Sequence, residues 1–213
     1  MQKISLSATG LGKYFGRRKI FSDLTFSVQE SNALAITGSN GSGKSTMLKI
    51  LAGVLSPTRG EVGIVLDGVP VKSEDRFSHL GYVAPYLQLY DEFTGLENLH
   101  IFRRIRGAGV GDDSILELLK QVGLSDRKDD FVRTYSSGMK QRLKYAFALL
   151  HQPPILLLDE PASNLDREGI ATVYEIMQRQ KQRGVLIIAT NDPGDLQLCD
   201  QVINIEPSPG ART

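Results

Sequence analysis

The sequence has little of several features that would assign a protein to a class at once. It contains one cysteine, Cys199, so no disulfide can form within the chain and no zinc site can be built from cysteines. A single thiol suits a reducing compartment such as the cytosol. Lysine and arginine number 25 against 24 aspartates and glutamates, a formal net charge of +1. This balance argues against a dedicated nucleic-acid binder, and we expect no nucleic-acid partner.

Long apolar runs are also missing. None approaches the roughly 20 residues of a membrane-spanning helix. The first residues, Met1 to Ile4, lead directly into a strand-like pattern and not into the apolar segment of a signal peptide. We therefore expect a chain that is soluble or that lies on a membrane surface. Two basic clusters, at 17–19 and 103–106, are interpreted as solvated faces, although either could contact lipid head groups or a partner.

The sequence does contain a glycine-rich segment that meets the pattern G-x-x-x-x-G-K-[ST] of a phosphate-binding loop. The apolar run 33–37 before it predicts a buried strand, and residues 45–51 after it predict a helix, which is the context that the motif requires. In this context a site for a nucleoside triphosphate is a better interpretation than an ordinary glycine turn. The residues predicted to contact the nucleotide are Gly38, Ser39, Asn40, Gly41, Ser42, Gly43, Lys44, Ser45 and Thr46.

The residue types of this loop explain how it would hold phosphate. Glycines let successive backbone N–H groups turn toward an anion, and the start of the following helix adds a field of the right sign. Lys44 supplies a mobile positive charge for the terminal phosphates. The hydroxyl of Ser45 can ligate Mg²⁺, so the sequence predicts that the nucleotide binds with this metal.

Two adjacent carboxylates follow a second apolar run. The segment 155–158 predicts a buried strand, and Asp159 and Glu160 stand at its carboxyl end, where ligands sit in parallel-sheet proteins. Asp159 is predicted to hold the metal shell, and Glu160 to orient or deprotonate water. The alternative is a surface turn before Pro161. It explains adjacent acids after four aliphatic residues less well in a chain that already carries a phosphate-binding loop.

The apolar periodicity predicts an α/β fold with a phosphate-loop NTPase core. Strands are expected at 4–8, 23–28, 33–37, 63–66, 80–84, 155–158, 185–190 and 201–205, and helices at 45–51, 94–106, 113–122, 137–151 and 166–182. Thr94 and Glu97 have the spacing of a capping box. Since two helices interrupt the core strands, the sequence predicts a core at 1–84 and 136–205, an inserted α-helical subdomain at 85–135 and a frayed tail at 206–213.

A third block, at 135–142, resembles the signature segment of the nucleotide-binding subunits of ABC transporters. The family pattern is L-S-G-G-Q-x-Q-R, and this chain reads Y-S-S-G-M-K-Q-R. The segment 161–166 is similar to the D-loop of that family, and the resemblance covers residues 3–205 with the motifs in the family order. The signature residues that match are Ser136, Gly138, Gln141 and Arg142, and those that depart are Tyr135, Ser137 and Met139.

The resemblance implies one ABC ATP-binding domain over 1–213, in which the nucleotide core carries an antiparallel β subdomain. It also implies two subunits, identical or related, that clamp two ATP molecules between the phosphate-binding loop of one and the signature of the other. Mg²⁺, a separate membrane permease and a peripheral place on the cytoplasmic face of the membrane follow from the same resemblance. The further ATP contacts that it implies are Phe15, stacked on adenine, with Ser136, Gly138 and Asp166.

The chain departs from the family pattern at two positions. Pro85 stands where the family has a glutamine that ligates Mg²⁺ or senses the γ-phosphate, and Gln88 replaces it only if the loop bends differently. A metal shell completed by water is the favoured interpretation. Asn191 stands in place of the switch histidine; its NH₂ can donate to a phosphate oxygen but cannot become cationic. With Glu160 and Asn191 as catalytic residues, the sequence predicts a slow or partner-dependent ATPase.

Within the family, the compactness of the chain is similar to small exporter-type ATPases, including the haem exporter ATPase of cytochrome c maturation. The leading hypothesis is an ATPase subunit that powers a separate permease. The main alternative is a soluble ABC-type regulatory switch that binds ATP but hydrolyses it poorly. A kinase using the same phosphate-binding loop is disfavoured, because the signature segment serves no kinase role.

Overall fold

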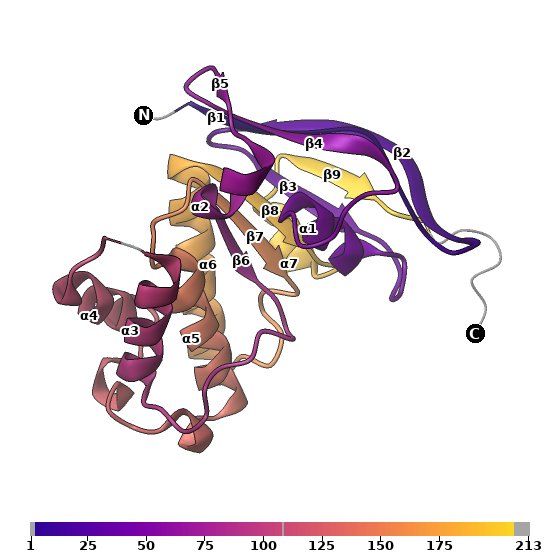
Figure 1. Cartoon of the computed structure of the whole chain (residues 1–213). Helices are drawn as coiled ribbons and strands as arrows, with labels where there is room; N and C mark the ends of the chain where they lie inside the picture. Colours follow the sequence, from indigo (N-terminus) through magenta and orange to yellow (C-terminus); the bar gives the residue numbers. More distant parts are fainter. Residues whose placement is uncertain (1–2, 108, 207–213) are drawn as a thin grey trace.

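Two β-sheets form the framework of the computed structural model, which describes residues 3–107 and 109–206 (Figure 1). The antiparallel sheet has the strand order β2-β1-β4-β5, and the parallel sheet has the order β6-β7-β8-β3-β9. The strands are β1 Ile4–Phe15, β2 Arg18–Gln29, β3 Ala33–Thr37, β4 Arg59–Leu66, β5 Val69–Pro70, β6 Leu80–Val83, β7 Ile155–Asp159, β8 Val185–Ala189 and β9 Gln201–Asn204.

Helices cover both faces of the parallel sheet. One of them, α1, lies between the two sheets, whereas α3, α4, α5 and α6 lie on the opposite face (Figure 1). The helices are α1 Lys44–Leu51, α2 Arg76–His79, α3 Gly95–Arg106, α4 Asp112–Gln121, α5 Ser137–Leu149, α6 Arg167–Arg183 and α7 Pro193–Gln197, with 3₁₀ turns η1 Ser73–Asp75, η2 Ser125–Arg127 and η3 Val132–Thr134.

The central strands are buried on both faces, as the apolar runs predict for a parallel sheet. In β7, Ile155 and Leu157 pack toward α1 and the antiparallel sheet, whereas Leu156 and Leu158 pack toward α5 and α6. Strand β8 alternates in the same way. The period of two along each strand therefore builds one core on each face of the sheet and leaves the carboxyl ends of the strands at one edge.

The fold class predicted from the sequence is confirmed, with differences at the ends of elements. The expected strands at 4–8 and 23–28 are parts of two longer strands that pair as a hairpin, closing with Phe15 opposite Arg18. The alternation of polar and apolar residues fails after Ala8 because the register of β1 shifts there and again after Leu11, which conceals the rest of the strand in the sequence. Apart from Glu206, the predicted tail lies outside the described residues.

Helix α3 shows the capping box that its sequence predicts. The Thr94 hydroxyl accepts from the N–H of Glu97 at 3.1 Å, and the Glu97 carboxylate accepts from the N–H of Thr94 at 2.8 Å. Buried Asn98 then binds the N–H and the carbonyl of Tyr90, each at 2.9 Å. These contacts fix the loop after β6 to the start of the helical region.

The basic cluster at the end of α3 has a structural role that the sequence did not indicate. Arg103 donates to Asp112 at 2.6 Å, and Arg106 donates to the Phe77 carbonyl at 3.0 Å. Arg106 also contacts the imidazole of His151, whose Nε2 lies 3.1 Å from the Leu80 carbonyl. The Arg106 guanidinium lies 2.8 Å from Nε2 and 3.2 Å from Nδ1, so a neutral imidazole, which keeps one ring nitrogen as an acceptor, suits this contact. The ends of α3 and α5 are joined by this arrangement.

Acid is expected to weaken the fold through His151. Burial, the nearby Arg106 guanidinium and His79 lower the pKa of His151 from 6.5 to about 4, against the hydrogen bond to the Leu80 carbonyl, which raises it. Between these values the unfolded chain binds a proton that the folded chain excludes, so the free energy of unfolding falls as pH drops from 6.5 toward 4. Urea unfolding of wild type and His151→Gln at several pH values checks this. We expect the free energy of unfolding of His151→Gln to fall less over that pH range than that of wild type. Equal falls in the two proteins would contradict the role of His151.

Candidate functional site

The predicted phosphate-binding loop connects β3 to α1, and its path depends on glycine at two positions. Gly38 has φ of 145°, and a Cβ there would lie 2.3 Å from the Ile205 carbonyl oxygen. Gly43 has φ of 112°, and a Cβ there would lie 2.4 Å from the Ile20 side chain. Both conformations and both contacts exclude larger residues. The loop therefore lies tightly against β9 and β2, and its other side remains open.

A cavity of about 310 Å³ opens on that free side. It faces the N-terminus of α1, where unpaired backbone N–H groups and the helix dipole favour an anion. A Cβ at Gly41 would meet nothing within 4 Å, so the loop backbone is accessible at its tip. The cavity is lined by Asn40, Gly41, Gly43, Lys44, Ser45, Thr46 and Glu160.

Lys44 and Glu160 place opposite charges at this cavity. The ammonium group of Lys44 is largely buried, donates to the Gly38 carbonyl at 2.8 Å and lies 3.9 Å from a carboxylate oxygen of Glu160. A phosphate group entering the cavity would offer this ammonium a stronger, charge-assisted acceptor. The geometry therefore suits a lysine whose ammonium group exchanges its hydrogen bond to a backbone carbonyl for one to a phosphate oxygen.

Asp159 ends β7 beside α1, and the residue is only 2% exposed. Burial raises the pKa of Asp159, and the hydroxyl of Ser45 and the charge of Lys44 oppose that shift. The Oδ1 atom of Asp159 is buried and has no hydrogen-bond partner among the residues that the structure describes. A buried carboxylate oxygen without a partner is unusual, and a bound cation would satisfy it. Asp159 and Ser45 therefore offer the hard oxygen ligands that Mg²⁺ prefers.

Few protein ligands surround this position. Within residues 3–107 and 109–206, no three His, Cys, Asp or Glu side chains lie close enough together to hold a metal ion by themselves. Mg²⁺ commonly binds through one or two protein oxygens, several waters and the phosphates of its nucleotide. The site thus fits a metal that arrives with the nucleotide better than a resident metal held by the protein alone.

Glu160 has a positive φ of 52°, which is uncommon for a residue other than glycine. Its N–H donates to the Ala189 carbonyl at 2.9 Å, which fixes the chain at the end of the sheet. The side chain is 45% exposed and lines the cavity. Burial raises the pKa of Glu160, whereas the neighbouring Lys44 lowers it. The strained turn places this carboxylate at the mouth of the cavity, where it can contact water.

Asn191 also reaches the phosphate-binding loop. Its Nδ2 donates to the carbonyl of Gly38 at 2.8 Å, and its Oδ1 accepts from the N–H of the same residue at 3.1 Å. Thr190, which precedes it, donates to buried Asp195 at 2.7 Å and accepts from the N–H of Asp192 at 3.0 Å, and these contacts hold the turn. Both polar groups of the Asn191 carboxamide are therefore engaged with the loop backbone.

Strand β6 and the loop after it carry a pair of residues that the sequence analysis missed. The hydroxyl groups of Tyr82 and Tyr86 lie 2.6 Å apart. Pro85 is exposed, and its carbonyl accepts from Lys144 at 2.7 Å. Gln88, considered above as a replacement for the missing glutamine, is also exposed. The spacing of Tyr82 and Tyr86 beside the missing glutamine was a signal that could have been used.

Other predicted site residues lie outside this cavity. Ser136 caps α5, and its hydroxyl accepts from the N–H of Met139 at 3.2 Å. Asp166 caps α6, and its carboxylate accepts from the N–H of Gly169 at 2.8 Å. A Cβ at Gly138 would lie 3.4 Å from the Asn164 carbonyl, so the signature segment packs against the predicted D-loop. Phe15 is half exposed at the end of β1. The structure brings the loop, both carboxylates and Asn191 together, and leaves these four residues apart from them.

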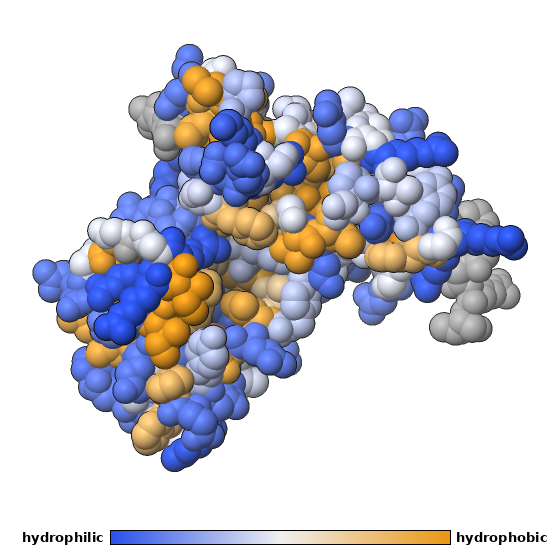
Figure 2. Space-filling view, in the orientation of Figure 1, coloured by the Kyte–Doolittle hydropathy of each residue, from blue (hydrophilic) through white to orange (hydrophobic). Residues whose placement is uncertain are grey.

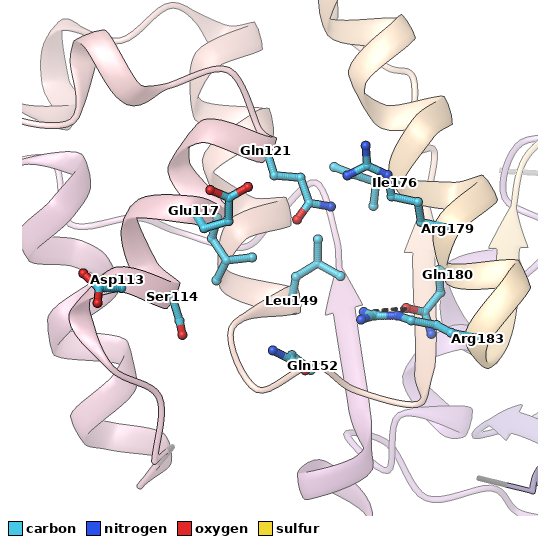
Figure 3. A pocket seen from close by; sticks show the side chains of 11 residues that line it. Asp113, Ser114, Glu117, Gln121, Leu149, Gln152, Ile176, Arg179, Gln180 and Arg183 are labelled. Carbon is cyan, nitrogen blue, oxygen red and sulfur yellow. Dashed lines mark hydrogen bonds between the residues drawn. The ribbon is translucent and has the colours of Figure 1, made fainter. Parts of the chain in front are cut away.

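A larger cavity, of about 570 Å³, lies between α4, the end of α5 and α6 (Figure 3). Charged, polar and apolar side chains line it, among them Glu117, Leu149 and Ile176. Figure 3 shows Arg183 turned to Gln180, with which it makes hydrogen bonds of 3.1 Å. No glycine-rich loop lines this cavity, and none of the buried side-chain atoms that lack a partner among the described residues belongs to its lining, so volume alone does not locate the nucleotide site.

The fold and the loop define the chain as a phosphate-loop nucleotide-binding protein. The family profile described as "ABC transporter" matches residues 21–163. The chain belongs to the ABC transporter family and is one of its ATP-binding proteins. Among the described residues, none of the helices has the length and apolar character needed to cross a bilayer.

Curated relatives agree with this family. The chain is 33% identical over 203 residues to the uncharacterized ABC transporter ATP-binding protein YhcH of Bacillus subtilis (strain 168), covering 94% of this chain and 66% of that protein. It is 37% identical to YxlF of the same organism, with 93% and 66% covered. The Nod factor export ATP-binding protein I of Bradyrhizobium diazoefficiens is 33% identical, with 97% and 69% covered. The chain thus spans 66% of the length of the two Bacillus proteins.

Solved structures show the same fold. A structure titled as the ATP binding subunit of an ABC transporter has a TM-score of 0.80 and 27% identity, covering 96% of this chain and 88% of that one. A bacterial Atm1-family ABC exporter with ATP bound has a TM-score of 0.82 at 23% identity, covering 97% and 38%. Because the identity to this exporter is only 23%, the similarity to it shows a shared fold and nothing more.

Proposed function

We propose that this chain is the ATP-hydrolysing subunit of an ABC transporter and that closure of an ATP-bound dimer powers a separate membrane permease. The observation that carries the proposal is the division of the predicted site. Lys44, Ser45 and Glu160 line one cavity next to Asp159, whereas Ser136 and Gly138, at the start of α5, are not in its lining. A second subunit is then needed to bring a signature segment to the nucleotide.

Each predicted residue has a role in this mechanism. The loop from Gly38 to Thr46 holds the phosphates, and Lys44 neutralises the terminal ones. Ser45 and Asp159 would hold Mg²⁺, and the metal would supply positive charge for the phosphates. Glu160 orients or accepts a proton from the attacking water. The remaining assigned residues are Phe15 for adenine, and Ser136, Gly138 and Asp166 for the nucleotide of the second subunit.

We also propose that residues 85–135 form a helical subdomain that contacts the permease. Large apolar side chains are exposed around α3, and Figure 2 shows apolar surface over the regions of α3 and α1. Exposed apolar surface of this kind indicates an interaction site. A peripheral place on the cytoplasmic face of a membrane follows from such a partner. The exposed residues are Phe77, Tyr86, Tyr90, Phe93 and Ile105.

The dimer is tested by cross-linking between subunits. In a Cys199→Ser background, which removes the native thiol, we would combine Ser39→Cys at the loop with Ser136→Cys at the signature. Both positions are exposed. The proposal predicts disulfide-linked dimers whose yield rises with Mg²⁺-ATP, and each single cysteine serves as a control. A yield that is independent of nucleotide, or no cross-linked dimer, contradicts the proposal.

A soluble ATP-binding switch is the second candidate, and the absence of the usual glutamine and histidine at Pro85 and Asn191 favours it. The two candidates differ in their partners. Purification of the chain from its own cells with a multi-span membrane protein would support transport. Stable association with a macromolecule in the soluble fraction, together with negligible hydrolysis, would support the switch.

Asn191→His is expected to raise kcat while weakening ATP binding. An imidazole can become cationic near the γ-phosphate, which the asparagine side chain cannot. If the missing charged donor limits hydrolysis, kcat should rise by up to about 100- to 1000-fold. The same change removes the two hydrogen bonds to Gly38, so KM is expected to rise by about 5- to 10-fold. Steady-state ATPase assays separate the two parameters. An unchanged kcat would show that another group already supplies the missing function.

A further inference from the structure

Tyr86 occupies the position directly after Pro85, where the family glutamine is absent. Its hydroxyl lies 2.6 Å from the hydroxyl of Tyr82, and the two rings meet edge to face with centroids 6.4 Å apart. Because each hydroxyl has one proton, one of them donates within the pair and the other keeps a proton for a further acceptor. The pair is therefore an incomplete hydrogen-bond chain with one free donor.

Strand register places this pair beside Asp159. Tyr82 lies opposite Leu157 in the parallel pairing of β6 with β7. Leu157 and Asp159 are two residues apart in β7 and so point to the same face of the sheet. Leu157 and Tyr82 both pack in the core on the side of α1. The carboxylate of Asp159 consequently lies on the same face as Tyr82. Burial is the main cause that raises the pKa of the Tyr82 and Tyr86 hydroxyls, and the negative charge of Asp159 adds to the shift.

Helix α1 places the pair close to Ser45 as well. The ammonium of Lys49 lies over the Tyr86 ring, 4.3 Å from its centroid. Lys49 and Ser45 are four residues apart in α1, so they lie on one face of the helix. Tyr86 thus packs against the same helix face as Ser45, one turn farther along. The tyrosine pair therefore neighbours both elements that supply the proposed Mg²⁺ ligands, β7 through Tyr82 and α1 through Tyr86.

The two other polar groups after β6 that could replace the missing glutamine, the Pro85 carbonyl and the Gln88 side chain, do not have such a position. The carbonyl of Pro85 accepts from Lys144. Gln88 is exposed, and no hydrogen bond of its side chain is found in the part of the chain that the structure describes. Tyr86 is 51% exposed, so solvent and a bound nucleotide can reach it.

We propose that the Tyr86 hydroxyl, oriented by Tyr82, donates a hydrogen bond to the hydrated Mg²⁺-nucleotide and replaces the glutamine that this chain lacks. This inference rests on the proposed function. A phenol oxygen offers the hydrogen-bonding capacity that a proline cannot supply. Tyr86 is a positioning residue in this scheme, because it orders the water around the metal and the terminal phosphate and exchanges no proton with them.

The test compares ATP affinity with and without the metal. Tyr86→Phe removes one oxygen atom and keeps the ring under Lys49. Isothermal titration calorimetry with ATP is done in excess Mg²⁺ and in EDTA. We expect the Kd in Mg²⁺ to rise about 3- to 10-fold, the effect of one neutral hydrogen bond, with no change in EDTA. Tyr82→Phe should shift the Kd in the same direction by a smaller factor.

Tyr90→Phe is the matched control. Tyr90 lies in the same loop as Tyr86, is half exposed and packs edge to face on Phe93. The affinity of Tyr90→Phe for ATP should equal that of wild type both in excess Mg²⁺ and in EDTA. Wild-type affinity of Tyr86→Phe in Mg²⁺, or an equal loss in Mg²⁺ and EDTA, would overturn the inference and leave the proposed function intact. Failure of wild type to bind Mg²⁺-ATP would overturn both.

Discussion

We expect Lys44→Ala to raise the Kd for ATP by about 10- to 150-fold, the range that corresponds to the loss of one hydrogen bond to a charged group. The Lys44 ammonium is the cation at the floor of the loop cavity, held 2.8 Å from the Gly38 carbonyl and 3.9 Å from Glu160. Without it, the terminal phosphates would face the Glu160 carboxylate with no compensating side-chain charge. Equilibrium binding of a fluorescent ATP analogue measures the change, and ATP hydrolysis should become undetectable.

The fold should survive this substitution. The Gly38 carbonyl that Lys44 leaves behind keeps a donor, the Nδ2 of Asn191 at 2.8 Å, so no buried carbonyl is orphaned. Lys72→Ala is the control for loss of a charge, because Lys72 is exposed and lies outside the cavity. Unchanged ATP affinity in a folded Lys44→Ala protein would refute the assignment of residues 38–46 as the phosphate-binding loop.

The parts of the site that could be predicted from sequence are those formed by consecutive residues. The strand at 33–37 coincides with β3, and the helix after it begins one residue earlier than expected, at Lys44. Asp159 and Glu160 follow the apolar strand that predicts them. In each case glycine conformation, helix start and apolar period act over fewer than ten residues, so the local sequence is sufficient.

Contacts between distant segments could not be predicted in the same way. Asn191 reaches Gly38 because β8 pairs beside β3, with Ile187 opposite Leu34, so that the ends of both strands meet at one edge of the sheet. Local pattern does not specify which strands are neighbours. Tyr145 is a similar case: it is fully buried, and its hydroxyl donates to the Pro161 carbonyl at 3.0 Å. This contact joins the helix that follows the signature to the D-loop.

One missed element did carry a local signal. Helix α7 begins with Pro193 at its first turn, after Asp192, whose side chain accepts from the N–H of Gly194 at 2.7 Å. A capping aspartate followed by proline is a typical helix start. The helix is only five residues long and lacks an apolar period, which is why periodicity alone did not reveal it. Its capping turn fixes the neighbouring Asn191.

Glu160→Gln is expected to slow ATP hydrolysis by about 100- to 10,000-fold, the usual contribution of a general base. The change preserves size and removes one negative charge at the mouth of the cavity, 3.9 Å from Lys44. ATP affinity should be retained, because Lys44 still has the Gly38 carbonyl as a partner in the free protein and the phosphates gain from the lost repulsion.

If hydrolysis is the step that reopens the dimer, this variant should accumulate as a dimer in Mg²⁺-ATP. A bound ligand shifts a two-state equilibrium toward the state that it prefers for as long as it persists, so blocking its conversion to ADP maintains the closed state. Size-exclusion chromatography with light scattering measures the oligomer in Mg²⁺-ATP, in Mg²⁺-ADP and without nucleotide. Glu61→Gln, an exposed change of the same kind on β4, should behave as wild type. A Glu160→Gln protein that stays monomeric in saturating Mg²⁺-ATP would contradict both the role of this carboxylate and the coupling of hydrolysis to dimer opening.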